Sequence, residues 1–148
     1  MSNKLNINSF STISVIGKGS YAKVLLVRKT STNQVFALKV LKKSKIMDKE
    51  KENKVFSERQ IMIELSNFPF IVKLHNSFQT EQNLYFVLEY CPGGELFELL
   101  HLRTKFSEDQ VRFYTAQLIL VLEYMHSKDI IHGDIKPENI LLDRDGYI

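Results

Sequence analysis

Cysteine is almost absent from this 148-residue sequence, because Cys91 is the only one. A single cysteine excludes an internal disulfide, and nothing in the sequence indicates secretion. No apolar run reaches the roughly 18 residues that a membrane-spanning helix needs. The first nine residues are polar and lack the hydrophobic region of a signal peptide. We therefore expect an intracellular protein, cytoplasmic by default, without a membrane span.

A large excess of charge of one sign is also missing. The 20 Lys and Arg residues face 17 Asp and Glu residues, which gives a net charge of +3. Nucleic-acid binders usually cluster their basic residues. Here the lysine-rich stretch 39–54 is interrupted by Asp48, Glu50 and Glu52, which favours a solvated helix face and no nucleic-acid partner. The composition, 44% hydrophobic and 25% charged, is typical of a globular domain.

Short apolar runs and alternating patterns predict five strands. The predicted strands are residues 10–16, 23–30, 35–41, 71–79 and 84–90. Helical spacing of apolar residues predicts helices at 54–66, 95–100 and 107–126. We expect an α+β fold with a five-stranded antiparallel sheet and one helix, followed by further helices. Residues 1–9 are expected to be a loose, flexible N-terminus.

The last predicted helix has a helix-start signal at its N-terminus and a stretch near its C-terminus that is apolar on all sides. Ser107 to Gln110 forms the pattern of a capping box, with Ser107 as N-cap. Residues 118–122 are apolar all round, so this part of the helix needs burial on every side. The residues after His126 are too few to cover it. We expect a partner surface to cover the helix near residues 118–122.

Two glycines, Gly17 and Gly19, lie between the first two predicted strands. A plain hairpin turn is one interpretation, because glycine adopts positive φ easily. A dinucleotide-binding loop is excluded, because that loop opens a helix and needs an acid about 20 residues later. The third interpretation is a glycine-rich loop between strands whose backbone N–H groups cover phosphates.

Lys39 and Glu58 form a possible internal ion pair. Lys39 alternates with Ala37 and Leu41 and so shares their face of a strand, although a lysine in a strand usually faces solvent. Glu58 lies within the apolar stripe of the helix at 54–66. A charge on a buried face is costly unless it meets an opposite charge, so each residue is the natural partner of the other.

Residues 132–139 (HGDIKPEN) form a short polar stretch between two apolar runs. Asp134 and Asn139 flank Lys136, and the apolar runs 130–131 and 140–142 are predicted to be buried strands. Such a loop can direct a carboxylate, an ammonium group and an amide towards one point.

This stretch resembles the catalytic-loop pattern H-R-D-L-x-x-x-N of eukaryotic protein kinases. Residues 36–39 (FALK) resemble V-A-I-K, and residues 17–22 (GKGSYA) with Val24 resemble the kinase glycine-rich loop. Because these parts occur in the family's order, the chain is identified as a member of that family over residues 10–148. Lys136 is typical of Ser/Thr kinases, and residues 84–97 (LYFVLEYCPGGELF) look most like the AGC group.

The resemblance implies an architecture and a reaction. It implies a kinase small lobe at 10–90, a hinge at 91–94 and a partial large lobe at 95–148. The reaction is transfer of the ATP γ-phosphate, with Mg²⁺, to a Ser or Thr hydroxyl of a protein substrate.

The resemblance also assigns site residues. Its catalytic set is Lys39, Glu58, Asp134 and Lys136, and Asn139 would hold Mg²⁺. Its nucleotide-binding set is Ile16, Gly17, Gly19, Val24, Ala37, Lys39, Leu88, Glu89, Cys91, Glu95 and Leu141.

The sequence departs from the family pattern at three places. Ala22 replaces the third glycine of the loop, and Gly133 replaces the Arg that often pairs with a phosphorylated activation loop. The D-F-G motif, whose Asp is the main magnesium ligand, does not occur before Ile148. We therefore expect a truncated piece that is inactive alone. The alternative is a non-catalytic, pseudokinase-like module that binds ATP or a partner.

Overall fold

The computed structural model describes residues 5–19 and 22–148 and contains two compact units. The first unit comprises the chain up to Glu64 together with residues 72–90, and the second comprises residues 65–71 and 91–148. Each unit is described by itself.

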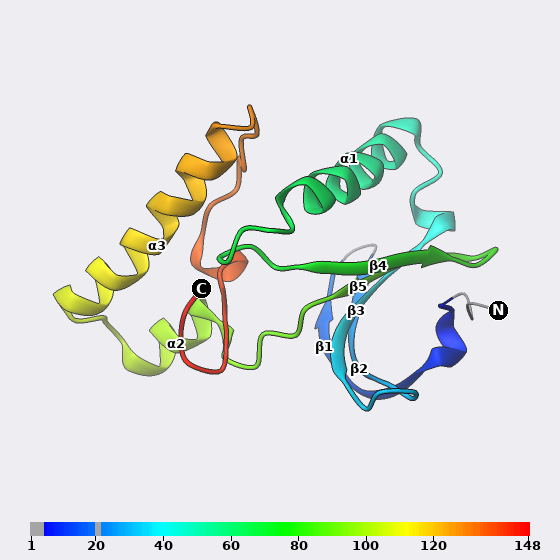
Figure 1. Cartoon of the computed structure of the whole chain (residues 1–148), viewed down its shortest axis with the longest axis horizontal. Coiled ribbons are helices and arrows are strands. Elements are labelled where there is room, and N and C mark those ends of the chain that lie inside the picture. Colours follow the sequence, from blue (N-terminus) through cyan, green and yellow to red (C-terminus); the bar gives the residue numbers. More distant parts are fainter. Residues whose placement is uncertain (1–4, 20–21) are drawn as a thin grey trace. The chain divides into compact units, whose positions relative to one another are not determined.

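The first unit is built on an antiparallel five-stranded sheet (Figure 1). The strand order is β1-β2-β3-β5-β4. The bounds are β1 Phe10–Lys18, β2 Ala22–Lys29, β3 Val35–Lys42, β4 Leu74–Gln79 and β5 Asn83–Leu88. Five strands and one helix in this unit confirm the predicted architecture. The predicted strand at 71–79 begins three residues later in the structure, at Leu74.

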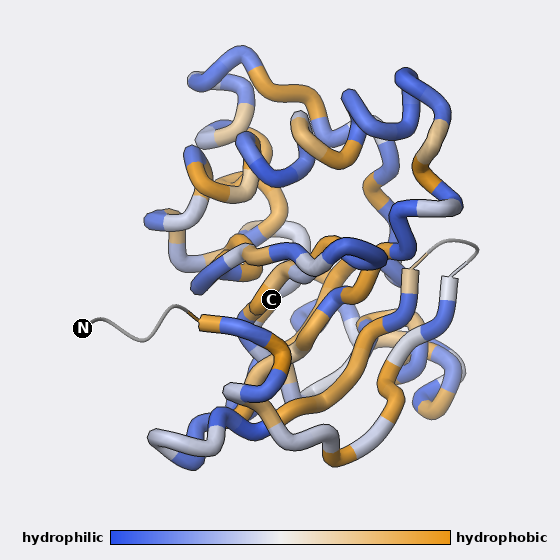
Figure 2. The backbone as a smooth tube through the Cα atoms, turned by 90° about the vertical axis from the view of Figure 1, so that its right-hand side faces the viewer, coloured by the Kyte–Doolittle hydropathy of each residue, from blue (hydrophilic) through white to orange (hydrophobic). Residues whose placement is uncertain are grey.

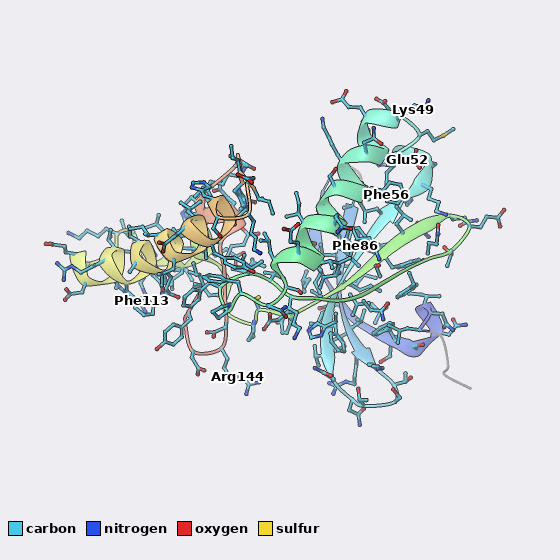
Figure 3. All side chains as sticks on the ribbon, turned by 45° about the horizontal axis from the view of Figure 1, so that its top comes forward. Lys49, Glu52, Phe56, Phe86, Phe113 and Arg144 are labelled. Atoms are coloured by element: carbon cyan, nitrogen blue, oxygen red, sulfur yellow. The ribbon has the colours of Figure 1, made fainter. Side chains whose placement is uncertain are left out.

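The strands place alternate residues on the two faces of the sheet, and each face carries an apolar cluster. Figure 2 shows the hydrophobic residues of the chain in orange. One face carries a cluster centred on Val27, Leu38 and Val87, which are the most deeply buried large side chains. The opposite face carries Leu41 and Phe86, and the helix α1 packs on it. Figure 3 shows Phe86 beneath α1.

The segment before the sheet packs on the first of these faces. Ile7–Ser9 form a 3-10 helix, which Asn6 caps with its side chain. Leu5 and Ile7 contact the cluster around Leu38. Of the N-terminus that the sequence predicts to be loose, residues 5–9 therefore make local contacts, and residues 1–4 lie outside the described residues.

The helix α1, Lys49–Leu65, starts five residues before the predicted position. The carboxylate of Asp48 accepts a hydrogen bond from the N–H of Glu50 at 3.0 Å, which satisfies one of the first N–H groups of the helix. Glu50 and Glu52 lie in the first turn, where negative charge is favoured by the helix dipole. The sequence contains these start signals. The charged first turn has no apolar stripe, however, so the spacing of apolar residues does not predict that the helix begins at Lys49.

The second unit contains two helices and a small strand pair. These elements are β6 Gly94–Glu95, α2 Leu96–Arg103, α3 Glu108–His126 and β7 Leu141–Leu142. A core of Leu96, Tyr114, Ile140 and Leu142 holds them together. The predicted capping box is present, since Ser107 accepts from the N–H of Gln110 and the Gln110 side chain accepts from the N–H of Ser107. In the same unit, the ring of Phe68 stacks on Tyr124 with 4.3 Å between centroids.

One strand prediction in this unit is wrong. Residues 130–131 form no strand, and Ile131 is 82% exposed. The apolar pair follows a turn at the end of α3 and finds no strand to pair with, whereas the second run pairs β7 with β6. An apolar dipeptide alone does not determine a strand, because the hydrogen bonds come from a partner elsewhere in the chain.

The apolar half of α3 is covered on one side only. Val121 and Met125 are buried, whereas Ile119 and Leu120 are exposed among the described residues. The described residues therefore do not cover residues 118–122 on every side. None of the helices in the described part of the chain combines the length and the apolar character needed to cross a bilayer.

Gly93 lies where the chain backbone approaches another strand closely. A Cβ atom at this position would lie 2.6 Å from the carbonyl oxygen of Asp143 and 2.6 Å from the Cβ of Leu142. The N–H of Gly93 donates to the carbonyl oxygen of Leu142 at 2.9 Å. Gly94 has φ +71° and begins β6. The Gly-Gly pair is thus a closely packed connection.

Candidate functional site

The glycine-rich segment closes the turn between β1 and β2. The N–H of Gly19 donates to the carbonyl oxygen of Ala22 at 2.8 Å, and Ser20 and Tyr21 between them lie outside the described residues. Gly17 lies opposite Val24. A Cβ atom at Gly17 would lie 3.3 Å from the Cβ of Val24, so a larger residue would crowd this pair.

Lys39 and Glu58 form the predicted ion pair. The Nζ atom of Lys39 donates to Oε1 of Glu58 at 2.5 Å, and the two side chains are 24% and 39% exposed. Strand β3 places Lys39 on the face that α1 covers, and the third turn of α1 places Glu58 above it. The alternative of a solvent-facing lysine is therefore wrong.

A cavity of about 310 Å³ lies beside this pair. Its lining includes Gly19, Lys39 and Glu58, so the glycine turn and the ion pair share one space. This size is at the lower end of the range of ligand pockets, about 300–1,000 Å³. Backbone N–H groups near a lysine in such a space can hold phosphate oxygens.

Several residues of the predicted nucleotide set lie near one another on the same face of the sheet. Val24 lies opposite Lys39 on β2, and Leu88 lies opposite Ala37 on β5. Apolar side chains on this face can contact an aromatic ring. The N–H of Glu89 donates to the carbonyl oxygen of Lys73 at 2.9 Å, so this donor is already used. Ile16, at the end of β1, is 45% exposed.

In the second unit, two polar side chains converge on Asp134. Its Oδ2 atom lies 2.9 Å from Nζ of Lys136 and accepts from Nδ2 of Asn139 at 2.9 Å. The same amide nitrogen donates to the carbonyl oxygen of Asp134 at 2.8 Å. The 3-10 helix Pro137–Asn139 turns the chain back and brings Asn139 to this point.

The backbone of the same loop has further constraints. The N–H of Asp134 donates to Nδ1 of His132 at 3.2 Å. Gly133 has φ +75°, a conformation that strains other residues, and no atom lies within 4 Å of an added Cβ. Gly133 therefore relieves a backbone constraint, in addition to removing the arginine of the family pattern.

Asp134 and Lys136 stabilise each other in their ionised forms. Hydrogen bonds from Lys136 and Asn139 lower the pKa of the Asp134 carboxyl below its usual value. The hydrogen bond to Asp134 raises the pKa of the Lys136 ammonium group. A carboxylate that is ionised and held by two donors can accept a further proton donor, such as a hydroxyl group.

Three other residues of the predicted set lie near the β6–β7 pair. Glu95 lies opposite Leu141, and its side chain makes no capping hydrogen bond to α2. The carbonyl oxygen of Cys91 accepts from the N–H of Gly94 at 3.4 Å, in the turn before β6.

The sequence analysis missed two features of these sites. It did not foresee that Nδ1 of His132 accepts from the N–H of Asp134, although a separation of two residues permits it. It also treated the lysines of residues 39–54 as a solvated helix face. Lys45, Lys51 and Lys54 in fact line the cavity beside Lys39. The charge pattern gave no signal of this, because the cavity forms from several segments that are separate in the sequence.

The glycine turn, the internal Lys–Glu pair and the Asp–Lys–Asn loop are features of phosphoryl-transfer proteins. The sequence matches the protein kinase domain family over residues 10–148. It is 46% identical over 147 residues to a RAC family serine/threonine-protein kinase homolog of Dictyostelium discoideum, with 99% of this chain and 33% of the relative covered.

Other relatives are similarly close. The serine/threonine-protein kinase Sgk1 of Fundulus heteroclitus is 48% identical over 141 residues, with 95% of this chain and 33% of that protein covered. The serine/threonine-protein kinase Sgk2 of Mus musculus is 45% identical over 139 residues, with 94% of this chain and 38% of that protein covered. The chain thus spans about a third of the length of the curated relatives it matches.

The chain belongs to the protein kinase domain family. The relatives named as RAC and Sgk kinases support the predicted likeness to the AGC group of serine/threonine kinases.

Proposed function

We propose that the protein that contains this chain transfers the γ-phosphate of ATP to a Ser or Thr hydroxyl of a protein substrate. The observation that carries the proposal is the Asp134 carboxylate, ionised and held by Lys136 and Asn139. Bound ATP·Mg²⁺ would supply the phosphoryl group and a cation that offsets its charge. The chain's own residues would bind, orient and accept a proton.

The first unit supplies the phosphate-binding part of this proposal. Glu58 orients the ammonium group of Lys39, which would neutralise the α- and β-phosphates. The backbone at Gly17 and Gly19 would cover the phosphates. The cavity beside Lys39 fits such a ligand, because it has both a cation and a glycine turn on its wall. Ile16, Val24, Ala37 and Leu88 would contact the adenine ring.

The second unit supplies the proton acceptor and a metal ligand. Asp134 would orient the substrate hydroxyl and accept its proton, and Lys136 would offset charge on the transferring group. The amide nitrogen of Asn139 is used by Asp134, so its amide oxygen is the atom for Mg²⁺, which prefers oxygen ligands. In this unit, the family pattern also assigns a nucleotide contact to Leu141, to the backbone of Cys91 and to the carboxylate of Glu95.

The binding partners and the cellular location of the protein are also proposals. Protein substrates and ATP are the partners that the family implies, and a cytoplasmic location accords with the sequence. A partner surface that covers Ile119 and Leu120 stays a prediction, supported by the exposure of both side chains.

The test uses the protein that contains this chain and measures nucleotide binding and phosphoryl transfer separately. ATP binding with Mg²⁺ is measured by thermal shift, since a ligand that binds the folded state raises the melting temperature. Lys39→Ala should lose the shift, whereas the matched surface variant Lys23→Ala should keep it. Asp134→Asn should keep the shift and lose transfer to a serine peptide by about 100-fold or more. Transfer that survives in Asp134→Asn would overturn the proposed role of this carboxylate.

A further inference from the structure

A second side-chain bond joins α1 to the sheet, one residue away from the Lys39–Glu58 pair. The Nε atom of Arg59 donates to Oγ of Ser77 on β4 at 2.7 Å, and this bond is partly buried. A hydrogen bond from a guanidinium group is charge-assisted, which makes it stronger than a bond between two neutral groups. The proposed function uses Lys39 and Glu58 but gives no role to Arg59.

The register of the sheet places the two partners of α1 in one row. Lys39 of β3 lies opposite Phe86 of β5, and Phe86 lies opposite Ser77 of β4. Residues directly opposite each other project from the same face of a sheet. Neighbouring strands lie about 4.8 Å apart, so the two outer residues of this row are separated by about 10 Å.

Two consecutive residues of α1 bond to the two ends of the row. Glu58 bonds to Lys39 at one end. Arg59 bonds to Ser77 at the other end. Phe86, between the two ends, is 3% exposed and lies beneath the helix (Figure 3). Consecutive residues of an α-helix point about 100° apart around its axis, so the two bonds pull on opposite sides and oppose rotation of the helix in both directions.

Apolar packing restrains α1 only weakly. Of the described residues of this helix, Leu65 in the last turn is the only buried one. Val55 and Met62 are partly buried against the cluster beneath the helix. Phe56 is 56% exposed. The orientation of the helix on the sheet therefore depends on its two polar bonds as well as on this packing.

We propose that Arg59 is a positioning residue, whose bond to Ser77 holds α1 in the orientation that presents Glu58 to the sheet. Glu58 in turn orients the ammonium group of Lys39, so the inference rests on the proposed function for its effect on the reaction. Among the described residues, Glu58 lines the cavity beside Lys39 and Arg59 does not. Arg59 thus acts through Glu58 rather than on the nucleotide.

The test uses the protein that contains this chain, with variants on β4 and α1. Ser77→Ala removes the acceptor of the bond, and Ser77→Thr keeps the hydroxyl group. Arg59→Met removes the donor and keeps an unbranched side chain. Gln79→Ala is the matched control, because Gln79 lies on the same strand and accepts at the same distance, 2.7 Å, from Lys43, which lies outside α1.

The first measurement needs no nucleotide. Hydrogen–nitrogen NMR on protein with isotope-labelled lysine follows the ammonium group of Lys39, whose signal is identified by its loss in Lys39→Met. Glu58→Gln gives the signal of the broken pair. In Ser77→Ala and Arg59→Met the signal should move about halfway or more towards that value, whereas Ser77→Thr and Gln79→Ala should leave it in place. A signal that stays in place in Ser77→Ala, or moves equally in Gln79→Ala, would overturn the proposal.

The second measurement is the dissociation constant of ATP with Mg²⁺, by calorimetry. Ser77→Ala and Arg59→Met should each raise it by about fivefold, since part of the energy of a charged hydrogen bond is lost. The double variant should raise it no further, because both changes break the same bond. Ser77→Thr and Gln79→Ala should leave it within about twofold.

The two measurements separate this inference from the proposed function. If ATP fails to bind the unmodified protein, the proposed function fails, and the NMR signal of Lys39 still decides whether Arg59 positions α1. If ATP binds with the same dissociation constant in Ser77→Ala as in the unmodified protein, the positioning role is refuted and the proposed function stands.

Discussion

The ion pair between Lys39 and Glu58 should contribute measurably to the stability of the first unit. The two atoms lie 2.5 Å apart, and the side chains are 24% and 39% exposed. Fully exposed pairs contribute about 0.2–1 kcal/mol, and hydrogen bonds to charged groups contribute about 1.5–3 kcal/mol. A half-buried pair partly screened by solvent lies between these ranges. We expect a coupling free energy of about 1 kcal/mol.

A double-mutant cycle measures this coupling. The free energy of unfolding in urea is determined for the unmodified protein, Lys39→Met, Glu58→Gln and the double variant. The pair Glu50–Lys54 gives a matched control, because its side chains are 74% and 72% exposed and it spans one turn of the same helix. Pairs of that kind couple by about 0.3–0.5 kcal/mol.

The coupling free energies from the two double-mutant cycles should differ in size and in their dependence on salt. Added salt should weaken the Glu50–Lys54 coupling more, because solvent ions reach exposed charges more readily. A Lys39–Glu58 coupling no larger than that of Glu50–Lys54 would refute the view that α1 holds an internal charge pair.

Three further predictions concern the second unit. Gly93→Ala should lower the free energy of unfolding by about 2–3 kcal/mol, because the added methyl carbon would lie 2.6 Å from a carbonyl oxygen. Gly146→Ala, with φ +87° and open space around it, should cost only about 1 kcal/mol in the same urea titration, and equal costs would contradict the close packing. Ser107→Ala should cost about 1 kcal/mol through loss of the capping box, and Ser107→Asn should restore most of it in thermal melts. The pKa of Asp134 is lowered, so its bonds to Lys136 and Asn139 are fully present above the usual carboxyl pKa of about 3.9 and are lost as the pH falls through the lower folded-state value. Carboxyl-carbon NMR should show this low pKa and its rise in Lys136→Met, and an unchanged pKa in that variant would contradict the contact.

Much of the first unit could be predicted because its signals are local. Alternation of apolar residues gave the strands, and strand periodicity placed Lys39 on the face of Ala37 and Leu41. In the second unit, the capping box joins Ser107 and Gln110, which are three residues apart, so it could also be predicted from the sequence. In each case the residues that determine the structure are neighbours in the chain.

The sequence predictions failed for features that the local pattern of apolar residues does not determine. The pair at 130–131 looks like a strand in the sequence, but strand formation needs another strand, which only the run at 140–142 has. The start of α1 was missed because its first turn is stabilised by Asp48 and by charges, with no apolar stripe. The lysine-lined cavity depends on β3, α1 and the glycine turn together, so no single segment indicates it.

Phosphoryl transfer in a single turnover tests the central claim most directly. The protein that contains this chain is purified and mixed with radiolabelled ATP, Mg²⁺ and matched peptides whose acceptor is Ser, Thr or Tyr. The initial rate is measured for this unmodified protein and for its Asp134→Asn variant, because the 148-residue chain by itself is expected to be inactive. We predict transfer to Ser and Thr but not to Tyr, with a rate that falls by about 100-fold or more in the variant. Nucleotide binding without transfer in the unmodified protein, or transfer that does not depend on Asp134, would contradict the account.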